Sequence, residues 1–255
     1  MRLVDGAQSI RADLPASSTV VVDVPLEAGD DLGTAVNRLS SLQAVRDAQL
    51  AALGRLGEDR WALTIGGDCG VELASVQHAA ASGDTAVLWI DAHPDLNRPD
   101  ESPSSAFHGM VLRTLLGEGD PTLVPAAPLR PEKVILVGAR AFDDAEDEFV
   151  RTSGIHLLSP ADLTVEALLA AIDATGASSL YIHIDLDVLD PSEMNGVGYP
   201  EPFGLTTVDL VSAIKAAKVH LPLVGAGITE FAPASADQAT DDLPSILRII
   251  GALTR

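Results

Sequence analysis

The sequence predicts an α/β fold in which a parallel sheet lies between two layers of helices, as a three-layer α/β/α arrangement. Short apolar runs typical of buried strands alternate along the chain with stretches of helical periodicity. Hydrophobic residues make up 47% of the 255, which is enough for a sizeable core. Because no internal repeat, low-complexity tract or linker interrupts the pattern, residues 1–255 are expected to form a single domain.

Strands are expected where apolar, β-branched runs are bounded by glycine, proline or polar residues. Residues 19–24 form the first such run, and residues 85–90 are apolar almost throughout, as expected of a strand buried on both faces. The complete set of predicted strands is 19–24, 61–65, 85–90, 133–138, 155–158, 179–187 and 221–228.

Helices are expected between these strands. The longest covers residues 35–56, where apolar side chains recur at helical spacing and Gly57 provides a stop. A polar loop over 140–148 leads into another helix, and either Thr164 or Ser159 is suited to cap a further one. The other predicted helices begin near residue 71 or cover 108–116, 164–174, 206–218 (capped by Thr206) and 243–253.

The composition limits the possible partners. A formal charge of -21 would repel nucleic acid and anionic membranes, whereas it could attract metal ions or guanidinium-like substrates. Most of this charge is better explained as a solvated surface that keeps the protein soluble. A single cysteine, Cys69, excludes an internal disulfide and fits a reducing cytoplasm. Neither a signal-peptide pattern nor an apolar run approaching ~20 residues is present, so we expect a soluble cytoplasmic protein.

Acidic and histidine side chains follow two of the predicted strands. Asp91, His93 and Asp95 come directly after residues 85–90, and Asp185 and Asp187 close the strand over 179–187. Alternation along a strand points each set to one side. Gathering carboxylates at the end of an apolar strand is unfavourable unless a cation is present. Although such acids can also act as turn caps, two patterned clusters favour one site for two hard divalent ions.

Four motifs occur in a fixed order, each at a predicted strand end. They are Gly66-Gly67-Asp68, Asp91-Ala92-His93-Pro94-Asp95, Asp185-Leu186-Asp187 with Asp190-Pro191, and Thr229-Glu230. With these motifs the chain resembles the arginase (ureohydrolase) family of binuclear manganese amidinohydrolases over nearly its whole length. An isolated Asp-x-His-x-Asp would be weak evidence, whereas four motifs in family order are specific.

The resemblance implies two Mn²⁺ ions per subunit and a defined set of ligands. Asp91 and Asp185 would bridge the ions, one site would be completed by His93 and Asp187, and the other by Asp95 and residue 69. Two ions about 3.5–4 Å apart lower the pKa of a bridging water, supplying hydroxide to attack a guanidinium carbon and release urea and an amine. Carboxylates with one or two imidazoles suit Mn²⁺, although zinc could displace it.

Two further residues match catalytic groups of the family. Asp95, already named as a metal ligand, is expected to take part in catalysis as well. His108 corresponds to the histidine proposed as proton shuttle or acid, although it could simply begin a helix. Glu230 corresponds to the carboxylate that pairs with the guanidinium. A surface position is the alternative for Glu230, but it follows an apolar strand at the matching place.

Cys69 departs from the family, which normally places a metal-binding histidine after Gly-Gly-Asp. A thiolate is a softer donor that must first lose its proton, so the first metal site is expected to be weak or empty. Family members that hydrolyse Nω-hydroxy-arginine tolerate cysteine here. Cys69 could also be a small core residue without metal contact. If it is a ligand, Cys69→His should raise the affinity for Mn²⁺.

The loop after the second motif indicates the substrate. By the resemblance, Asn97, Ser102 and Ser104 hold an α-carboxylate, for which amide and hydroxyl groups are suitable donors. Asp143 and Glu146 match the acids that receive the α-ammonium, although acids are also common at a helix N-terminus. Ala106 departs from the usual asparagine, and Tyr199 stands where arginases have threonine beside the guanidinium. Arginine or a relative such as Nω-hydroxy-arginine is the expected substrate.

Two alternatives remain open at this point. The first is another substrate within the family: agmatine, guanidinobutyrate or formiminoglutamate. The second is a non-catalytic protein that keeps the fold after degrading its first metal site. The expected partners are a small guanidino substrate and further copies of the chain, because the family commonly forms trimers or hexamers.

Overall fold

The computed structural model describes residues 2–57, 59–81 and 83–254 and contains one six-stranded sheet in which every pairing is parallel. The strand order is β1-β6-β5-β2-β3-β4. The strands are β1 (Leu63–Ile65), β2 (Thr85–Ile90), β3 (Val134–Val137), β4 (His156–Leu158), β5 (Ser179–Asp185) and β6 (Leu223–Thr229). The predicted α/β class is confirmed.

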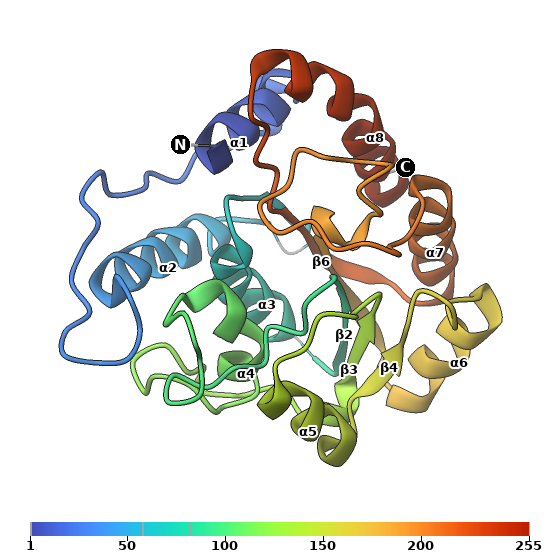
Figure 1. Cartoon of the computed structure of the whole chain (residues 1–255), viewed down its shortest axis with the longest axis horizontal. Coiled ribbons are helices and arrows are strands. Elements are labelled where there is room, and N and C mark those ends of the chain that lie inside the picture. The colour runs from blue at the N-terminus through green and yellow to red at the C-terminus, as the bar shows by residue number, and fades with distance from the viewer. Residues whose placement is uncertain (1, 58, 82, 255) are drawn as a thin grey trace.

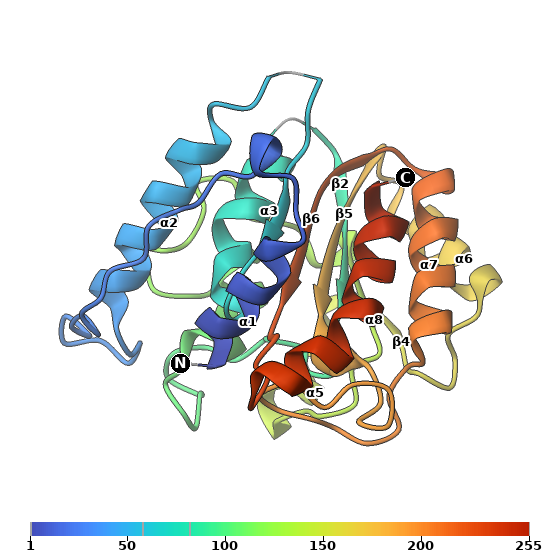
Figure 2. The same ribbon diagram turned by 90° about the horizontal axis from the view of Figure 1, so that it is seen from above.

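Helices cover both faces of this sheet, as Figure 2 shows. One core contains side chains from α1 (Arg2–Ala12), α6 (Val165–Thr175), α7 (Thr207–His220) and α8 (Ala236–Thr254). The other contains side chains from α2 (Leu39–Leu53), α3 (Glu72–Ala80), α4 (Val111–Leu115) and α5 (Asp144–Ser153). Within the described ranges, none of these helices has the length and apolar character needed to cross a membrane.

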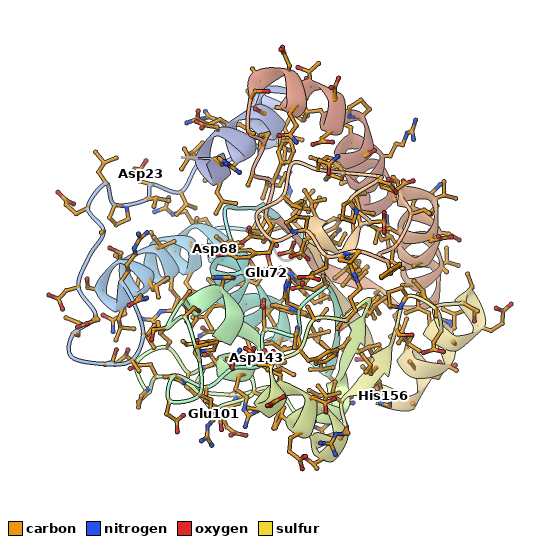
Figure 3. The ribbon with its side chains drawn as sticks, in the orientation of Figure 1. Asp23, Asp68, Glu72, Glu101, Asp143 and His156 are labelled. Carbon is orange, nitrogen blue, oxygen red and sulfur yellow. The ribbon has the colours of Figure 1, made fainter. Side chains whose placement is uncertain are left out.

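The strand predicted over residues 19–24 is wrong. This segment has no strand assignment, and Val20 and Val24 are 73% and 66% exposed. It lies in the extended connection on the outside of the molecule, where Asp23 is labelled in Figure 3. Although β-branched side chains favour strands, a strand also needs a hydrogen-bonded neighbour and a face to bury. The edge strand β1 pairs instead with β6.

Helix boundaries differ from the predictions where the backbone is unusual. Helix α2 begins at Leu39 rather than residue 35, because the preceding Arg38 has a left-handed φ of 61°. Helix α8 begins at Ala236 rather than residue 243 and contains Pro244. Helix α1 was not predicted at all. The capping predictions for Thr164 and Thr206 are confirmed, since each side chain accepts a backbone N–H of the first helical turn.

The topology brings four strand ends to one edge of the sheet. Ile90 of β2 is in register with Ile184 of β5, and Asp185 is in register with Thr229 of β6. Because parallel strands end on the same side, the segments after β1, β2, β5 and β6 meet there. Strands β6, β5 and β2 run side by side between the helices in Figure 2, and Figure 1 shows β6, β2 and β3 with helices around them.

Candidate metal centre and substrate cavity

A cavity of about 320 Å³ lies at this edge of the sheet. Its lining contains every residue that the sequence analysis assigned to the site. These are Cys69, Asp91, His93, Asp95, Asn97, Ser102, Ser104, His108, Asp143, Glu146, Asp185, Asp187, Tyr199 and Glu230. Segments separated by up to 161 positions in the chain therefore line the same cavity, as expected from the strand order.

A fully buried group of potential metal donors lies at the base of the cavity. It consists of Cys69, Asp91, His183 and Asp185, whose donor atoms all lie within 4.8 Å of one another. The Cys69 Sγ is 3.0 Å from Asp185 Oδ2 and 3.8 Å from His183 Nε2. The His183 Nε2 is 3.5 Å from Asp91 Oδ2. We call these four residues the deep group.

A second group, the outer group, shares Asp91 and adds His93 and Asp187. His93 Nδ1 lies 3.0 Å from Asp187 Oδ2 and 3.7 Å from Asp91 Oδ1. Asp187 also accepts the backbone N–H of Ala92 at 3.2 Å, which fixes it against the segment after β2. Asp91 lies between the two groups and could therefore contact an ion in either.

Electrostatics make this cluster a place for cations. Burial, reinforced by the charges of Asp187 and Asp91, raises the pKa of Asp185 well above its usual range. Burial also raises the pKa of Asp187 to about 6 and that of Glu230 to about 9. For Asp91, hydrogen bonds with His183 and His93 outweigh burial, so its pKa is lowered. Burial and repulsion between neighbouring carboxylates both disfavour the ionised form of these side chains. A bound cation would offset this repulsion.

Asp95 and Glu230 have backbone conformations that non-glycine residues rarely adopt. Their φ angles are 53° and 64°, in the left-handed region. Such strain tends to occur at functional sites, where the surroundings hold the residue in place. Asp95 belongs to neither donor group, yet its Oδ2 is buried and has no hydrogen-bond partner among the described residues.

The mouth of the cavity holds hydrogen-bonding groups on loops. Asn97 Nδ2 donates to Asp143 Oδ2 at 2.8 Å, while the buried Asn97 Oδ1 has no partner within the described ranges. Glu146 accepts the backbone N–H groups of Leu96 and Asp143, each at 2.9 Å. With Asp143 as N-cap it forms a capping box for α5. Both acids therefore shape the helix start as well as line the cavity.

Two serines and one tyrosine complete the mouth. Ser102 Oγ accepts the backbone N–H of Ser105, and Ser104 Oγ accepts that of Ala106, both at 3.1 Å. Since each hydroxyl also carries a proton, each can still donate to a ligand. Tyr199 is 54% exposed and its ring stacks on His108, with 5.3 Å between centroids.

Sequence reasoning assigned no role to His183 or Glu72, although both are completely buried beside the deep group. His183 had a readable signal, because it precedes Asp185 by two positions in a strand and so projects to the same side. Glu72 had none, since it follows the Gly-Gly-Asp motif on a helix and reaches His183 only through the packing of α3 against the sheet. Figure 3 shows Glu72 near the centre of the molecule.

Comparison with known proteins agrees with the fold and identifies the family. The profile of the arginase family matches residues 6–247. The N(omega)-hydroxy-L-arginine amidinohydrolase of Streptomyces lavendulae is 32% identical over 226 residues, which cover 88% of this chain and 79% of that protein. The arginase of Bacillus caldovelox is 33% identical over 185 residues, covering 67% of this chain and 62% of that protein. The crystal structure of Bacillus cereus arginase gives a TM-score of 0.79 at 27% identity, covering 87% of this chain and 80% of that chain. The chain belongs to the arginase family, whose members are hydrolases that act on amidine C–N bonds.

Proposed function

We propose that this protein is a metal-dependent amidinohydrolase that cleaves the guanidinium group of arginine or of a close relative such as Nω-hydroxy-arginine. The products are ornithine and urea or hydroxyurea. The observation that carries the proposal is the cavity itself, in which two groups of metal donors lie below a mouth lined by acids and hydroxyls. This arrangement suits a substrate with a guanidinium at one end and an amino acid at the other.

The residues at the base fit two divalent ions. The outer group offers two carboxylates and one imidazole, a donor set that suits Mn²⁺. Asp95 Oδ2, buried without a partner among the described residues, is an additional oxygen for an ion to use. When bound, such ions lower the pKa of water and so supply a nucleophile near neutral pH.

Two residues act on the substrate at the reacting end. Glu230 is 3% exposed and lines the cavity beside the acids of the base, so its carboxylate would pair with the guanidinium and orient it. His108 lines the same cavity under the ring of Tyr199 and would pass a proton to the departing amine. Tyr199, which stacks on His108, would offer its hydroxyl to a modified guanidine.

The mouth would hold the amino-acid end. The carboxylates of Asp143 and Glu146 provide acceptors for an α-ammonium. The hydroxyl protons of Ser102 and Ser104 provide donors for an α-carboxylate. The two kinds of group stand on different segments, and this separation supports an α-amino acid over a plain amine.

The test is hydrolysis by purified protein loaded with Mn²⁺, measured as loss of substrate and release of the amine product. Arginine and Nω-hydroxy-arginine are compared with agmatine and guanidinobutyrate, which share the guanidine but differ at the other end, and with formiminoglutamate, which carries a formimino group in place of the guanidine. We expect the two α-amino acids with a guanidine to have the highest kcat/KM. Turnover of agmatine without turnover of either would contradict the proposed substrate, and inactivity on all five at saturating Mn²⁺ would support a non-catalytic role. Cytoplasmic location and assembly into trimers or hexamers stay predictions, and light scattering checks the latter.

A further inference from the structure

We propose that His183 is a metal ligand which supplies the imidazole that position 69 lacks. The deep group would then be a four-donor site made by Cys69, His183 and the carboxylates of Asp91 and Asp185. It would bind a softer ion, such as Zn²⁺ or Co²⁺, than the outer group does. The inference rests on the proposed metal dependence and names a ligand for it.

The spacing of the donor atoms fits one small ion. Zinc bonds of about 2.0–2.3 Å to oxygen, nitrogen and sulfur place tetrahedral ligands roughly 3.5 Å apart. In the deep group, Cys69 Sγ is 3.0 Å from Asp185 Oδ2, 3.8 Å from His183 Nε2 and 4.0 Å from Asp91 Oδ2. His183 Nε2 is 3.5 Å from Asp91 Oδ2. An ion placed among these atoms would require only small side-chain movements.

The other nitrogen of His183 is backed by a buried carboxylate. His183 Nδ1 lies 3.5 Å from Glu72 Oε2, which also accepts the hydroxyl of Tyr181 at 2.7 Å. Metal-binding histidines almost always direct their second ring nitrogen at such a group, which fixes the tautomer and strengthens the ligand. Neither His183 Nδ1 nor Glu72 Oε1 completes a hydrogen bond among the described residues. An ion on Nε2 would leave the proton on Nδ1, directed toward Glu72.

The surrounding structure is shaped to hold this pair. A Cβ at Gly227 would lie 1.8 Å from Glu72 Oε1, so only glycine leaves space for the carboxylate beside β6. On the other side, the Trp89 ring packs on His183 with centroids 3.8 Å apart. Trp89 Nε1–H also donates to Asp91 Oδ2 at 3.2 Å, which orients a second donor of the deep group.

The donor atoms distinguish the two groups chemically. The deep group contains a thiol and an imidazole, whereas the outer group contains only oxygen donors and one imidazole. Sulfur and nitrogen donors in tetrahedral sites favour Zn²⁺ and Co²⁺, while oxygen-rich sites suit Mn²⁺. All four residues of the deep group are buried, so an ion there would be shielded from solvent.

Co²⁺ titration of the metal-stripped full chain tests the proposal without any substrate. The first equivalent should give a sulfur-to-cobalt charge-transfer band from Cys69 and intense visible bands typical of tetrahedral coordination. In His183→Ala the charge-transfer band should persist, the tetrahedral bands should weaken, and Co²⁺ affinity should fall by about 100-fold or more. Glu72→Gln should lower the affinity by about 10–100-fold, as is usual for the partner of a metal-bound histidine. His156→Ala is the matched control, because that histidine lies on β4 outside the cavity.

A folded His183→Ala protein with wild-type Co²⁺ affinity and spectrum would overturn the proposal. So would a wild-type protein whose first equivalent shows no sulfur band, since His183 would then act as a buried cation or core residue.

If His183→Ala does not fold, proton NMR of the wild-type protein with one equivalent of Co²⁺ decides. A hyperfine-shifted imidazole N–H that exchanges slowly with D₂O is expected for the buried Nδ1–H, and its absence would count against His183. None of these readouts needs turnover, so a protein that binds Co²⁺ through His183 yet hydrolyses neither arginine nor Nω-hydroxy-arginine would contradict the proposed function alone.

Discussion

The base and the mouth of the cavity are built in different ways. At the base, Asp91 and Asp185 are 1% and 2% exposed and lie at the ends of paired strands. At the mouth, Ser102 and Ser104 lie in a loop, and Tyr199 is 54% exposed. The sheet register therefore fixes the reacting end, while the loops set what the rest of the substrate meets. A change at the base should alter metal binding and turnover, whereas a change at the mouth should alter which substrate is chosen.

The largest effect is expected from Asp185→Asn at the base. The loss of a charged donor in the deep group should lower metal affinity by more than about 100-fold, since even partners of metal ligands contribute about 10–100-fold. The metal-free variant should meanwhile be more stable than the wild type, because burial and the charge of Asp187 disfavour an ionised Asp185. Metal competition assays and urea denaturation of the stripped protein measure the two effects.

The matched control for this variant is Asp173→Asn. It removes an exposed carboxylate on α6 that pairs with His220 on α7. It should leave metal affinity unchanged. Unaltered metal affinity in Asp185→Asn would show that the base does not bind ions through this residue. It would also contradict the expectation that changes at the base act on metal binding.

A smaller loss is expected from Glu230→Gln, which keeps the shape and the left-handed backbone but removes the charge. If this carboxylate pairs with the guanidinium, transition-state stabilisation should fall by about 2–5 kcal/mol, as for one member of a buried charge pair, which lowers kcat/KM by about 30-fold or more. Metal content should not change, because Glu230 belongs to neither donor group. Steady-state urea release together with metal analysis checks both statements. A fall in metal content that explains the lost activity would place Glu230 among the ligands instead.

The base could be anticipated from sequence because it follows local patterns. Residues 85–90 form the strand as predicted, and alternation directs the acids that follow it to one side. The chain order of strands and helices was then enough to predict a parallel sheet with these ends together. Four family motifs also lie at these ends, so the local pattern and the resemblance agreed.

The features that were missed depend on tertiary partners. The run over residues 19–24 has strand propensity, but it is exposed and pairs with none of the strands that the structure describes, so propensity alone misled. His183 and Glu72 meet only because α3 packs on β5 and β6, and no spacing in the sequence encodes that contact. The orientation of Tyr199 over His108 likewise depends on a long glycine- and proline-rich loop.

At the mouth, the double substitution Ser102→Ala and Ser104→Ala should change selectivity rather than chemistry. Hydrogen bonds to a charged group contribute about 1.5–3 kcal/mol each, and solvent at the mouth places the combined loss near the lower value. We expect KM for arginine-like substrates to rise about tenfold, with kcat nearly unchanged. Agmatine, which has no α-carboxylate, serves as the internal control and should keep its KM. Equal losses for both substrates would mean that the serines maintain the loop and do not read the carboxylate.

The smallest effect on the base is expected from Glu146, whose pH dependence links the mouth to the fold. Burial raises the pKa of Glu146 to about 7, although the N–H groups of Asp143 and Leu96 favour its ionised form. Because the folded pKa lies above the unfolded value, this side chain stabilises the protein most below about pH 4.5 and loses that contribution as pH rises toward 7. The free energy of unfolding of the wild type relative to Glu146→Gln should therefore fall by about 2–3 kcal/mol across this range.

Denaturant unfolding of the metal-stripped proteins at several pH values measures this difference, at constant ionic strength. Glu148→Gln is the control for removing one carboxylate from α5, because Glu148 is exposed and pairs with Arg151 on the same helix. In Glu146→Gln the new amide has one acceptor oxygen where the carboxylate has two, so a pH-independent loss of stability is expected beneath the change with pH. If the difference instead grew as pH rose, the ionised carboxylate would be the stabilising form. The capping box of α5 would then outweigh burial, and this part of the mouth would be as firmly fixed as the base.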